Sequence, residues 1–253
     1  MSKKRLLKFG LIGLLIGLII LMAGFVIWAS IPPAPLLAEV DQALISDTAV
    51  TVSESPWLIF EPKTAYDTAF IFYPGGKVPP QAYAPALKAI AEAGYLGIIV
   101  PMPLNLAVFN PYAANDVIQA YPDVKHWAIG GHSLGGAMAA TFADQEPSPV
   151  EGIVFWAAYP AEANRLDDLT DLAVTSIYAT NDGLANPEKI EANRPFLPPQ
   201  TEWVAIEGGN HAQFAWYEFQ EGDGVASISR EEQQAQTIAA TLALLARFDA
   251  DNN

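Results

Sequence analysis

The sequence has 253 residues, of which 51% are apolar, and this composition excludes an intrinsically disordered chain. It contains no cysteine, which excludes disulfide bonds, a thiolate nucleophile and cysteine-ligated metals. Four of the 13 basic residues lie in the first eight positions and all 28 acidic residues follow them, so the remainder carries a net charge of −19. Nucleic acids repel so acidic a domain, and we expect no nucleic-acid partner.

The first segment predicts a membrane anchor. Residues 9–28 contain no charged side chain and are long enough to cross a bilayer as a helix, which takes about 20 residues. The basic residues precede this stretch, so the positive-inside rule places the N-terminus in the cytoplasm and the rest of the chain outside. A cleaved signal peptide is the alternative, but the apolar stretch is long for one and no clear cleavage site precedes Pro32.

We therefore divide the chain into four parts. These are a cytoplasmic N-terminus at 1–8, a transmembrane signal-anchor helix at 9–29, a linker with a short helix at 30–47, and a catalytic domain at 48–253. The membrane is expected as a partner through the helix at 9–29, and no obligate protein partner is expected.

Strands and helices alternate along the domain. Apolar runs predict strands at 48–53, 57–60, 68–73, 96–100, 127–129, 150–157, 172–179 and 202–206. Helical spacing predicts helices over 37–44, 83–91, 115–121 and 134–144, and a last helix whose capping box is Ser229 with Glu232 and whose buried face carries Ala235, Ile238, Leu242 and Leu245. This order predicts a three-layer α/β/α sandwich with a mostly parallel sheet.

A candidate nucleophile lies in Gly131-His132-Ser133-Leu134-Gly135-Gly136. The pattern G-x-S-x-G between a strand and a helix is typical of a nucleophile elbow, which exposes the hydroxyl of Ser133 on a tight turn. At the start of the following helix, the N–H of Leu134 is free to stabilise a developing negative charge. A plain strand–helix turn is the alternative interpretation.

The general base follows by elimination among three histidines. His132 adjoins Ser133, and neighbouring side chains on a tight turn diverge. His126 begins the strand, at the wrong edge of the sheet. His211 follows the last strand in a glycine-rich loop, where a histidine is positioned to take the serine proton and return it to the leaving group.

A carboxylate must orient this histidine, and Asp182 is the first candidate. It follows a strand and keeps the order Ser, Asp, His that is expected of such a fold, although Asn181-Asp182-Gly183 also suits an ordinary turn. The fallback acids are Asp167, Asp168 and Asp171, while Glu207 is too close to the strand that precedes His211.

The loop Pro74-Gly75-Gly76-Lys77 follows another buried strand and is expected to complete an oxyanion hole. We expect the backbone N–H of Gly76 to be the donor, with that of Lys77 as the alternative. Six aromatic residues near strand ends are candidates for the pocket lining or for packing: Phe109, Tyr112, Trp156, Phe214, Trp216 and Tyr217.

From about Thr48 to Phe248 the chain resembles the α/β-hydrolase superfamily, in particular its lidless, dienelactone-hydrolase-like branch of the fold-5 type. The stretches that carry the resemblance are Tyr73-Pro74-Gly75-Gly76, Pro101-Met102-Pro103, Gly131 to Gly136, Thr180-Asn181-Asp182-Gly183 and Gly208-Gly209-Asn210-His211-Ala212-Gln213-Phe214. The resemblance implies a Ser133–His211–Asp182 triad with an oxyanion hole at Leu134 and the Gly76 region. Dienelactone hydrolases use a cysteine nucleophile, which this chain lacks, so their substrate is not carried over.

These features together predict a membrane-anchored serine hydrolase of small-molecule carboxylic esters that needs no cofactor and no metal. No stretch between 157 and 182 is long enough for a large helical lid, so we expect an open pocket. The alternatives are a thioesterase, amidase or acyltransferase on the same fold, or an inactive hydrolase fold that serves as a binding module.

Overall fold

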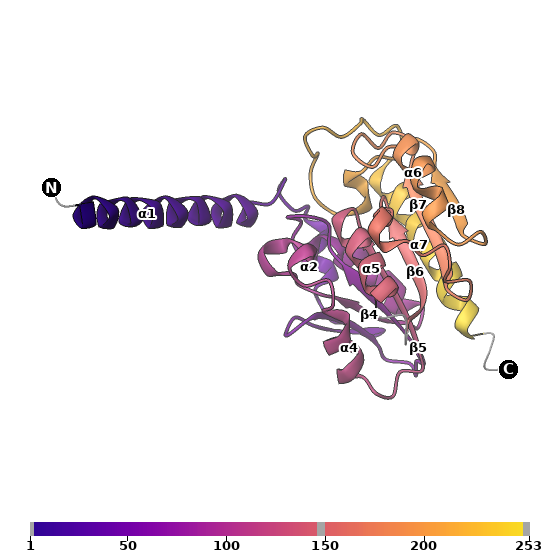
Figure 1. Ribbon diagram of the computed structural model, residues 1–253. Coiled ribbons are helices and arrows are strands. Elements are labelled where there is room, and N and C mark those ends of the chain that lie inside the picture. The colour runs from indigo at the N-terminus through magenta and orange to yellow at the C-terminus, as the bar shows by residue number, and fades with distance from the viewer. Residues whose placement is uncertain (1–2, 146–149, 250–253) are drawn as a thin grey trace.

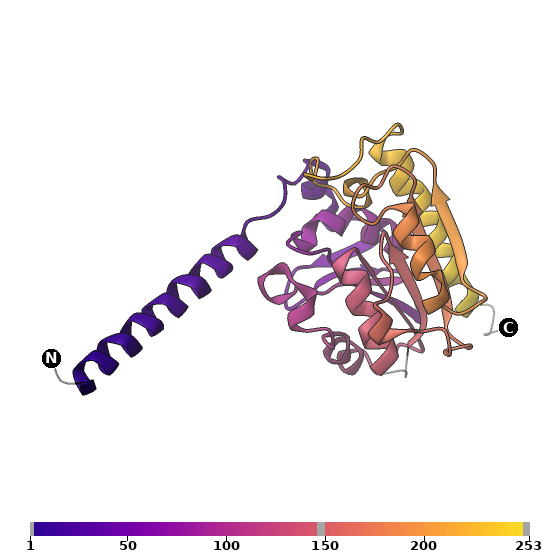
Figure 2. The same cartoon turned by 45° about the horizontal axis from the view of Figure 1, so that its top comes forward.

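The structure is a computed structural model of the chain and describes residues 3–145 and 150–249. Helix α1 (Lys3–Ser30) projects as a single rod from the domain that follows it (Figures 1 and 2). Within α1, the stretch Phe9–Ser30 is long and apolar enough to cross a membrane. The predicted span is therefore helical, and the helix extends beyond it at both ends.

An eight-stranded sheet forms the centre of the domain. In chain order its strands are β1 (Val50–Ser53), β2 (Leu58–Pro62), β3 (Thr68–Tyr73), β4 (Leu96–Ile99), β5 (His126–His132), β6 (Val150–Trp156), β7 (Ala173–Ala179) and β8 (Glu202–Ile206). Their spatial order is β1-β2-β4-β3-β5-β6-β7-β8. Strands β1 and β2 are antiparallel to their neighbours, whereas β3 to β8 are parallel, as the alternating pattern predicted.

Helices cover both faces of this sheet. They are α2 (Glu39–Ala43), α3 (Ala84–Glu92), α4 (Ala114–Ala120), α5 (Leu134–Gln145), α6 (Pro187–Asn193) and α7 (Arg230–Asp249), with 3-10 turns at Pro80–Tyr83, Pro103–Asn105, Ala107–Phe109, Glu162–Asn164, Arg194–Phe196 and Ala212–Phe214. Buried side chains of α3 and α7 share one core, and those of α4 and α5 share the other. Two cores on opposite faces complete the three-layer sandwich that the sequence predicted.

The carboxyl ends of the parallel strands lie level with one another. Tyr73 at the end of β3 pairs with Gly131 of β5, and His132 pairs with Trp156 at the end of β6. Ala179 at the end of β7 likewise pairs with Ile206 of β8. The loops after these strands therefore meet at one edge of the sheet, which is where ligands bind in sheets of this kind.

Helix α7 begins as predicted, and Ile238, Leu242 and Leu245 of its predicted face pack on the core. Its capping box forms, since the N–H of Ser229 donates to Glu232 and the N–H of Glu232 donates to the Ser229 hydroxyl. Leu245 is buried as expected, but Ala235 is exposed, so that prediction was wrong. Polar Gln233 is buried in its place because its side-chain amide bonds both backbone groups of residue 210.

Candidate active site

The strand–helix turn at the centre of the sheet holds the candidate nucleophile in a strained conformation. Ser133 follows the last residue of β5, precedes the first residue of α5 and has a φ of 51°. A non-glycine residue rarely adopts this left-handed conformation, which costs roughly 1–2 kcal/mol. A Cβ on Gly131 would lie 2.6 Å from the backbone nitrogen of Gly136, and one on Gly135 would overlap the carbonyl oxygens of Tyr73 and Pro74. These glycines therefore allow the turn to pack against β3.

A buried histidine–carboxylate pair lies on the loops after β7 and β8. The Nδ1 atom of His211 lies 2.7 Å from an Oδ2 atom of Asp182, and their side chains are 2% and 0% exposed. The other carboxylate oxygen of Asp182 accepts the backbone N–H groups of Leu184 and Ala185, both at 2.7 Å. These bonds fix the carboxylate, and the carboxylate in turn fixes the orientation of the imidazole and its tautomer.

The histidine ring packs against the nucleophile turn. The ring centroid of His211 lies 4.4 Å from that of His132, the residue that precedes Ser133. The structure thus brings the three predicted residues, Ser133, His211 and Asp182, to the same edge of the sheet from the ends of β5, β8 and β7. The chemistry that such an arrangement suits is proton transfer at a serine hydroxyl.

A hydrogen-bonded chain that the sequence analysis missed supports this turn. The buried hydroxyl of Tyr83 lies 2.9 Å from Nδ1 of His132 and accepts the N–H of Gly75, also at 2.9 Å. Burial and the neighbouring His211 hold the pKa of His132 well below its usual value, and burial raises the pKa of Tyr83. Both groups are therefore neutral, and a hydrogen bond between the hydroxyl and Nδ1 joins them. This chain joins the loop after β3 to the nucleophile turn.

A second carboxylate, Asp223, connects the loops of the acid and the base. Its Oδ1 atom accepts the backbone N–H groups of Gly183 and His211, both at 3.1 Å, and its Oδ2 atom accepts that of Ala212 at 2.8 Å. Asp223 lies on the long loop before α7, 41 residues beyond Asp182 in the numbering of the chain. No short motif marks it, and only the fold reveals that it holds the two loops together.

The loop after β3 lies beside the start of α5. A Cβ on Gly76 would be 3.2 Å from a methyl carbon of Leu134. Among the described residues, neither the Gly76 nor the Leu134 N–H donates a hydrogen bond, whereas the N–H of Lys77 donates to the carbonyl of Asn105 at 2.6 Å. Of the two donors expected in this loop, Gly76 is thus the one that remains free to bind an oxyanion.

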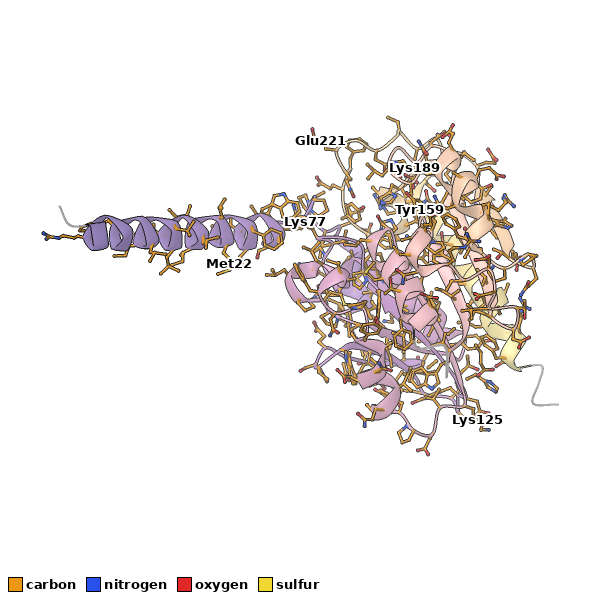
Figure 3. All side chains as sticks on the ribbon, in the orientation of Figure 1. Met22, Lys77, Lys125, Tyr159, Lys189 and Glu221 are labelled. Carbon is orange, nitrogen blue, oxygen red and sulfur yellow. The ribbon has the colours of Figure 1, made fainter. Side chains whose placement is uncertain are left out.

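A cavity of about 310 Å³ opens next to the serine. Its lining is small and largely apolar and consists of Ser133, Leu134, Ala137, Ala157, Ala158, Tyr159, Leu184 and Ala185. Figure 3 labels Tyr159 on the domain and Lys77 at the domain end of α1. Between β6 and β7, residues 157–172 contain only the short turn Glu162–Asn164 as a helical element. The cavity therefore has no large helical cover from that segment.

The six aromatic candidates for the lining do not line this cavity. Trp156, Phe214 and Tyr217 are fully buried in the core, and Trp216 is 8% exposed. Phe109 is 51% exposed on the turn Ala107–Phe109. These four buried rings therefore pack in the core and do not contact the cavity.

The fallback residues lie elsewhere. Asp167 is paired with Arg165 on the surface, and Glu207 is exposed. His126 lies at the amino edge of the sheet, 3.0 Å from Glu151. Within residues 3–145 and 150–249, no three histidine or acidic side chains are arranged to hold a metal ion.

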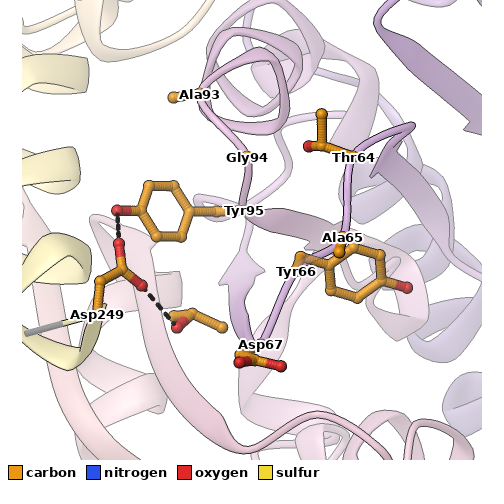
Figure 4. A pocket seen from close by; sticks show the side chains of 9 residues that line it. Thr64, Ala65, Tyr66, Asp67, Ala93, Gly94, Tyr95 and Asp249 are labelled. Carbon is orange, nitrogen blue, oxygen red and sulfur yellow. Dashed lines mark hydrogen bonds between the residues drawn. The ribbon is translucent and has the colours of Figure 1, made fainter. Parts of the chain in front are cut away.

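A larger cavity of about 470 Å³ also lies at the amino edge. Asp249 there accepts the hydroxyl of Tyr95 at 2.6 Å and that of Thr68 at 3.5 Å (Figure 4). The described lining of this cavity, residues 64–68, 93–95 and 249, contains no histidine. It therefore lacks the base that the carboxyl edge provides, in spite of its greater volume.

Solved structures with the same fold include several hydrolases. The esterase domain of a Rhodothermus marinus protein is 14% identical, with 74% of this chain and 91% of that chain covered and a TM-score of 0.55. Est1E from Butyrivibrio proteoclasticus is 12% identical, with coverages of 79% and 100% and a TM-score of 0.56. A Klebsiella pneumoniae chain assigned as a dienelactone hydrolase is 16% identical, with coverages of 78% and 97% and a TM-score of 0.51.

Identities this low establish the fold and leave the activity open. A comparison with curated protein sequences found no match. The family model described as the alpha/beta hydrolase family, however, matches residues 69–235, which span the nucleophile turn and the loops of His211 and Asp182. This chain belongs to the alpha/beta hydrolase family.

Proposed function

We propose that the protein is a serine hydrolase that cleaves carboxylic esters. The observation that carries this proposal is the buried 2.7 Å pair of His211 and Asp182 beside a serine held at positive φ. The ionisable pair is buried away from solvent, and the serine beside it is strained and partly exposed. Residues that served only for packing or for a turn would not need this combination.

The reaction would proceed through an acyl-enzyme. The Ser133 oxygen attacks the ester carbonyl carbon while His211 takes its proton, and the N–H groups of Leu134 and Gly76 stabilise the oxyanion. The carbon–oxygen bond to the alcohol then breaks as His211 returns the proton to the leaving oxygen. Water next attacks the acyl-serine, His211 accepts its proton, and the carboxylic acid leaves with Ser133 restored.

The cavity supports an ester with a small or flexible apolar acyl group. Four of its eight lining residues are alanines, and two more are Leu134 and Leu184. Two structural neighbours with the same fold are described as an esterase domain and as Est1E, and their low identity leaves the substrate of this chain to be measured.

The test uses the full chain in detergent with p-nitrophenyl esters of two to sixteen carbons. We expect hydrolysis by the wild type and a loss of at least about 10³-fold in kcat for Ser133→Ala, since the nucleophile is removed. Ser229→Ala, which removes only the cap of α7, is the matched control and keeps its activity. A folded wild type that hydrolyses no ester, thioester or amide would instead favour a binding module.

We further propose that α1 is an uncleaved anchor with the domain outside the cytoplasm. Support comes from its last turn, where Ala29 is fully buried and Trp28 contacts Lys77, since cleavage after this turn would remove those contacts. An N-terminal epitope tag tests this. We expect the tag to remain on the chain in the membrane fraction and to be protected from protease added outside the cell, whereas release of a shortened domain would refute it.

A further inference from the structure

The anchor helix contacts the domain at one place, next to the candidate active site. The Nζ atom of Lys77 lies 4.3 Å from the centre of the Trp28 ring. The rings of Phe25 and Phe109 meet edge to face, with centroids 6.1 Å apart. Figure 3 shows Lys77 at the domain end of α1. The last turns of α1 are thus packed on the loops that hold Lys77 and Phe109.

These same loops border the candidate oxyanion hole. Lys77 directly follows Gly76, whose backbone lies against Leu134, the residue after Ser133. The N–H of Lys77 bonds the carbonyl of Asn105, which joins the loop after β3 to the segment that leads to Phe109. The end of the anchor is therefore separated from the nucleophile turn by little more than one loop.

Exposed apolar side chains of the domain lie at this contact. Beyond residue 36, the described residues include five large apolar side chains that are strongly exposed, namely Ile45, Val108, Phe109, Phe219 and Val225. Val108 and Phe109 are adjacent on the turn that touches α1. Phe219 is two positions after Tyr217, which pairs with linker residue Leu36. Exposure of apolar side chains costs least where they meet lipid instead of water.

With α1 as the proposed membrane anchor, this turn would lie within the bilayer. Phe25 is five residues before Ser30, and a helix rises 1.5 Å per residue, so Phe25 lies about 7 Å below the outer end of the span. Phe109, in contact with Phe25, lies at the same level. Trp28 and Lys77 then occupy the interface, where tryptophan rings and lysine ammonium groups are favoured.

We infer that the side chains of Val108 and Phe109 insert into the outer leaflet and hold the edge of the candidate active site there. The substrate is then a bilayer-resident ester whose acyl chain enters from the membrane. This inference rests on the proposed serine esterase and on its anchor. The net charge of −19 beyond the first eight residues disfavours anionic headgroups, so the ester is a neutral or zwitterionic lipid. Hydrolysis consumes one water and yields a fatty acid and an alcohol.

The first test compares two substrates on the full chain in phosphatidylcholine nanodiscs. One is the water-soluble p-nitrophenyl acetate, and the other is a fluorogenic long-chain acylglycerol in the bilayer. For Val108→Ser with Phe109→Ser, we expect unchanged hydrolysis of the acetate and a loss of about tenfold or more on the acylglycerol, because two apolar anchors leave the lipid. The matched control, Ile45→Ser with Val225→Ser, keeps both activities.

The second test measures depth and uses the absence of cysteine from the chain. A single cysteine at position 109 or 225 is labelled with an environment-sensitive fluorophore, and spin-labelled phosphatidylcholine is added as quencher. We expect quenching at position 109 and none at 225. A water-exposed probe at 109, or equal loss on both substrates in the double variant, would overturn the inference.

The outcomes also separate this inference from the proposed function. A wild type that hydrolyses the acetate but not the acylglycerol refutes the membrane substrate and leaves the esterase intact. A wild type that hydrolyses neither ester refutes the esterase, and with it the substrate inferred here.

Discussion

The two edges of the sheet each carry a histidine–carboxylate pair, and the pairs differ in burial. At the carboxyl edge, His211 and Asp182 lie 2.7 Å apart with side chains 2% and 0% exposed. At the amino edge, His126 and Glu151 lie 3.0 Å apart with side chains 17% and 41% exposed. Water competes for the second pair and is excluded from the first, so only the first holds one geometry firmly.

The same residue types therefore have different uses at the two edges. The carboxyl edge receives loops from four parallel strands, which bring a serine and two free backbone N–H groups to the buried pair. The amino edge has a larger cavity, but its described lining contains no histidine. Strand direction, rather than cavity volume, decides where the chemistry of this fold lies.

The largest expected effect separates the two carboxylates. Asp182→Asn is expected to fold and to lose about 10⁴-fold in kcat, because an amide holds the wrong histidine tautomer. Glu151→Gln removes the corresponding acid at the amino edge and is expected to keep wild-type activity. Steady-state hydrolysis of p-nitrophenyl acetate measures both. Normal activity in Asp182→Asn would refute the proposed role of Asp182 in orienting His211.

Two glycines extend the comparison to stability. Gly135→Ala places a methyl group against the Tyr73 and Pro74 carbonyl oxygens and is expected to destabilise the domain by about 3 kcal/mol or more. Gly94 follows α3 at the amino edge, and a Cβ there would meet no atom within 4 Å. Gly94→Ala is therefore expected to lower the free energy of unfolding by only about 1–2 kcal/mol, because alanine disfavours a φ of 103°. Thermal unfolding in detergent ranks the two, and the reverse order would contradict the packing described for the nucleophile turn.

The buried imidazole of His132 predicts a pH dependence of stability. Its pKa is held below the usual value in the folded protein, so the unfolded chain binds the proton first as the pH falls through about 6.5. The contribution of His132 to the free energy of unfolding is complete above that pH. As the pH falls below it, this free energy decreases by up to about 1.4 kcal/mol per pH unit. Unfolding midpoints of wild type and His132→Gln, measured from pH 7.5 to 5, are expected to converge toward low pH. Parallel curves would refute this.

The smallest effects distinguish two tyrosines. Tyr83→Phe leaves the Gly75 N–H and a His132 nitrogen unpaired in the core, at an expected cost of about 1–3 kcal/mol. Tyr95→Phe removes one bond to Asp249 near the surface and is expected to cost about 0.5–1 kcal/mol with no effect on hydrolysis. Urea unfolding compares them, and equal costs would show that the bond to His132 adds nothing.

Much of the fold was predictable because its signals are local. Buried strands of the parallel sheet are short apolar runs, and the predicted strand at 68–73 agrees with β3 residue for residue. The anchor and the nucleophile pattern are also continuous in the sequence. The order of Ser133, Asp182 and His211 along alternating strands and helices also predicts that all three lie at one edge of the sheet.

The parts that were missed depend on contacts between distant residues. Tyr83 and His132 are 49 positions apart, and no sequence pattern around either residue predicts the hydrogen bond between them. The predicted face of α7 was wrong at Ala235 and missed Gln233 and Thr241, which are buried because partners on other elements satisfy their polar groups. Periodicity of apolar residues cannot detect a polar side chain whose partner comes from elsewhere.

Covalent labelling tests the central claim most directly. The full chain is treated with a fluorophosphonate, digested and mapped by mass spectrometry, with Ser133→Ala and His211→Gln treated in parallel. We predict one adduct on Ser133 in the wild type, none in Ser133→Ala, and much slower labelling in His211→Gln, because the base is lost. An adduct on another residue, or labelling of Ser133 that is independent of His211, would contradict the account.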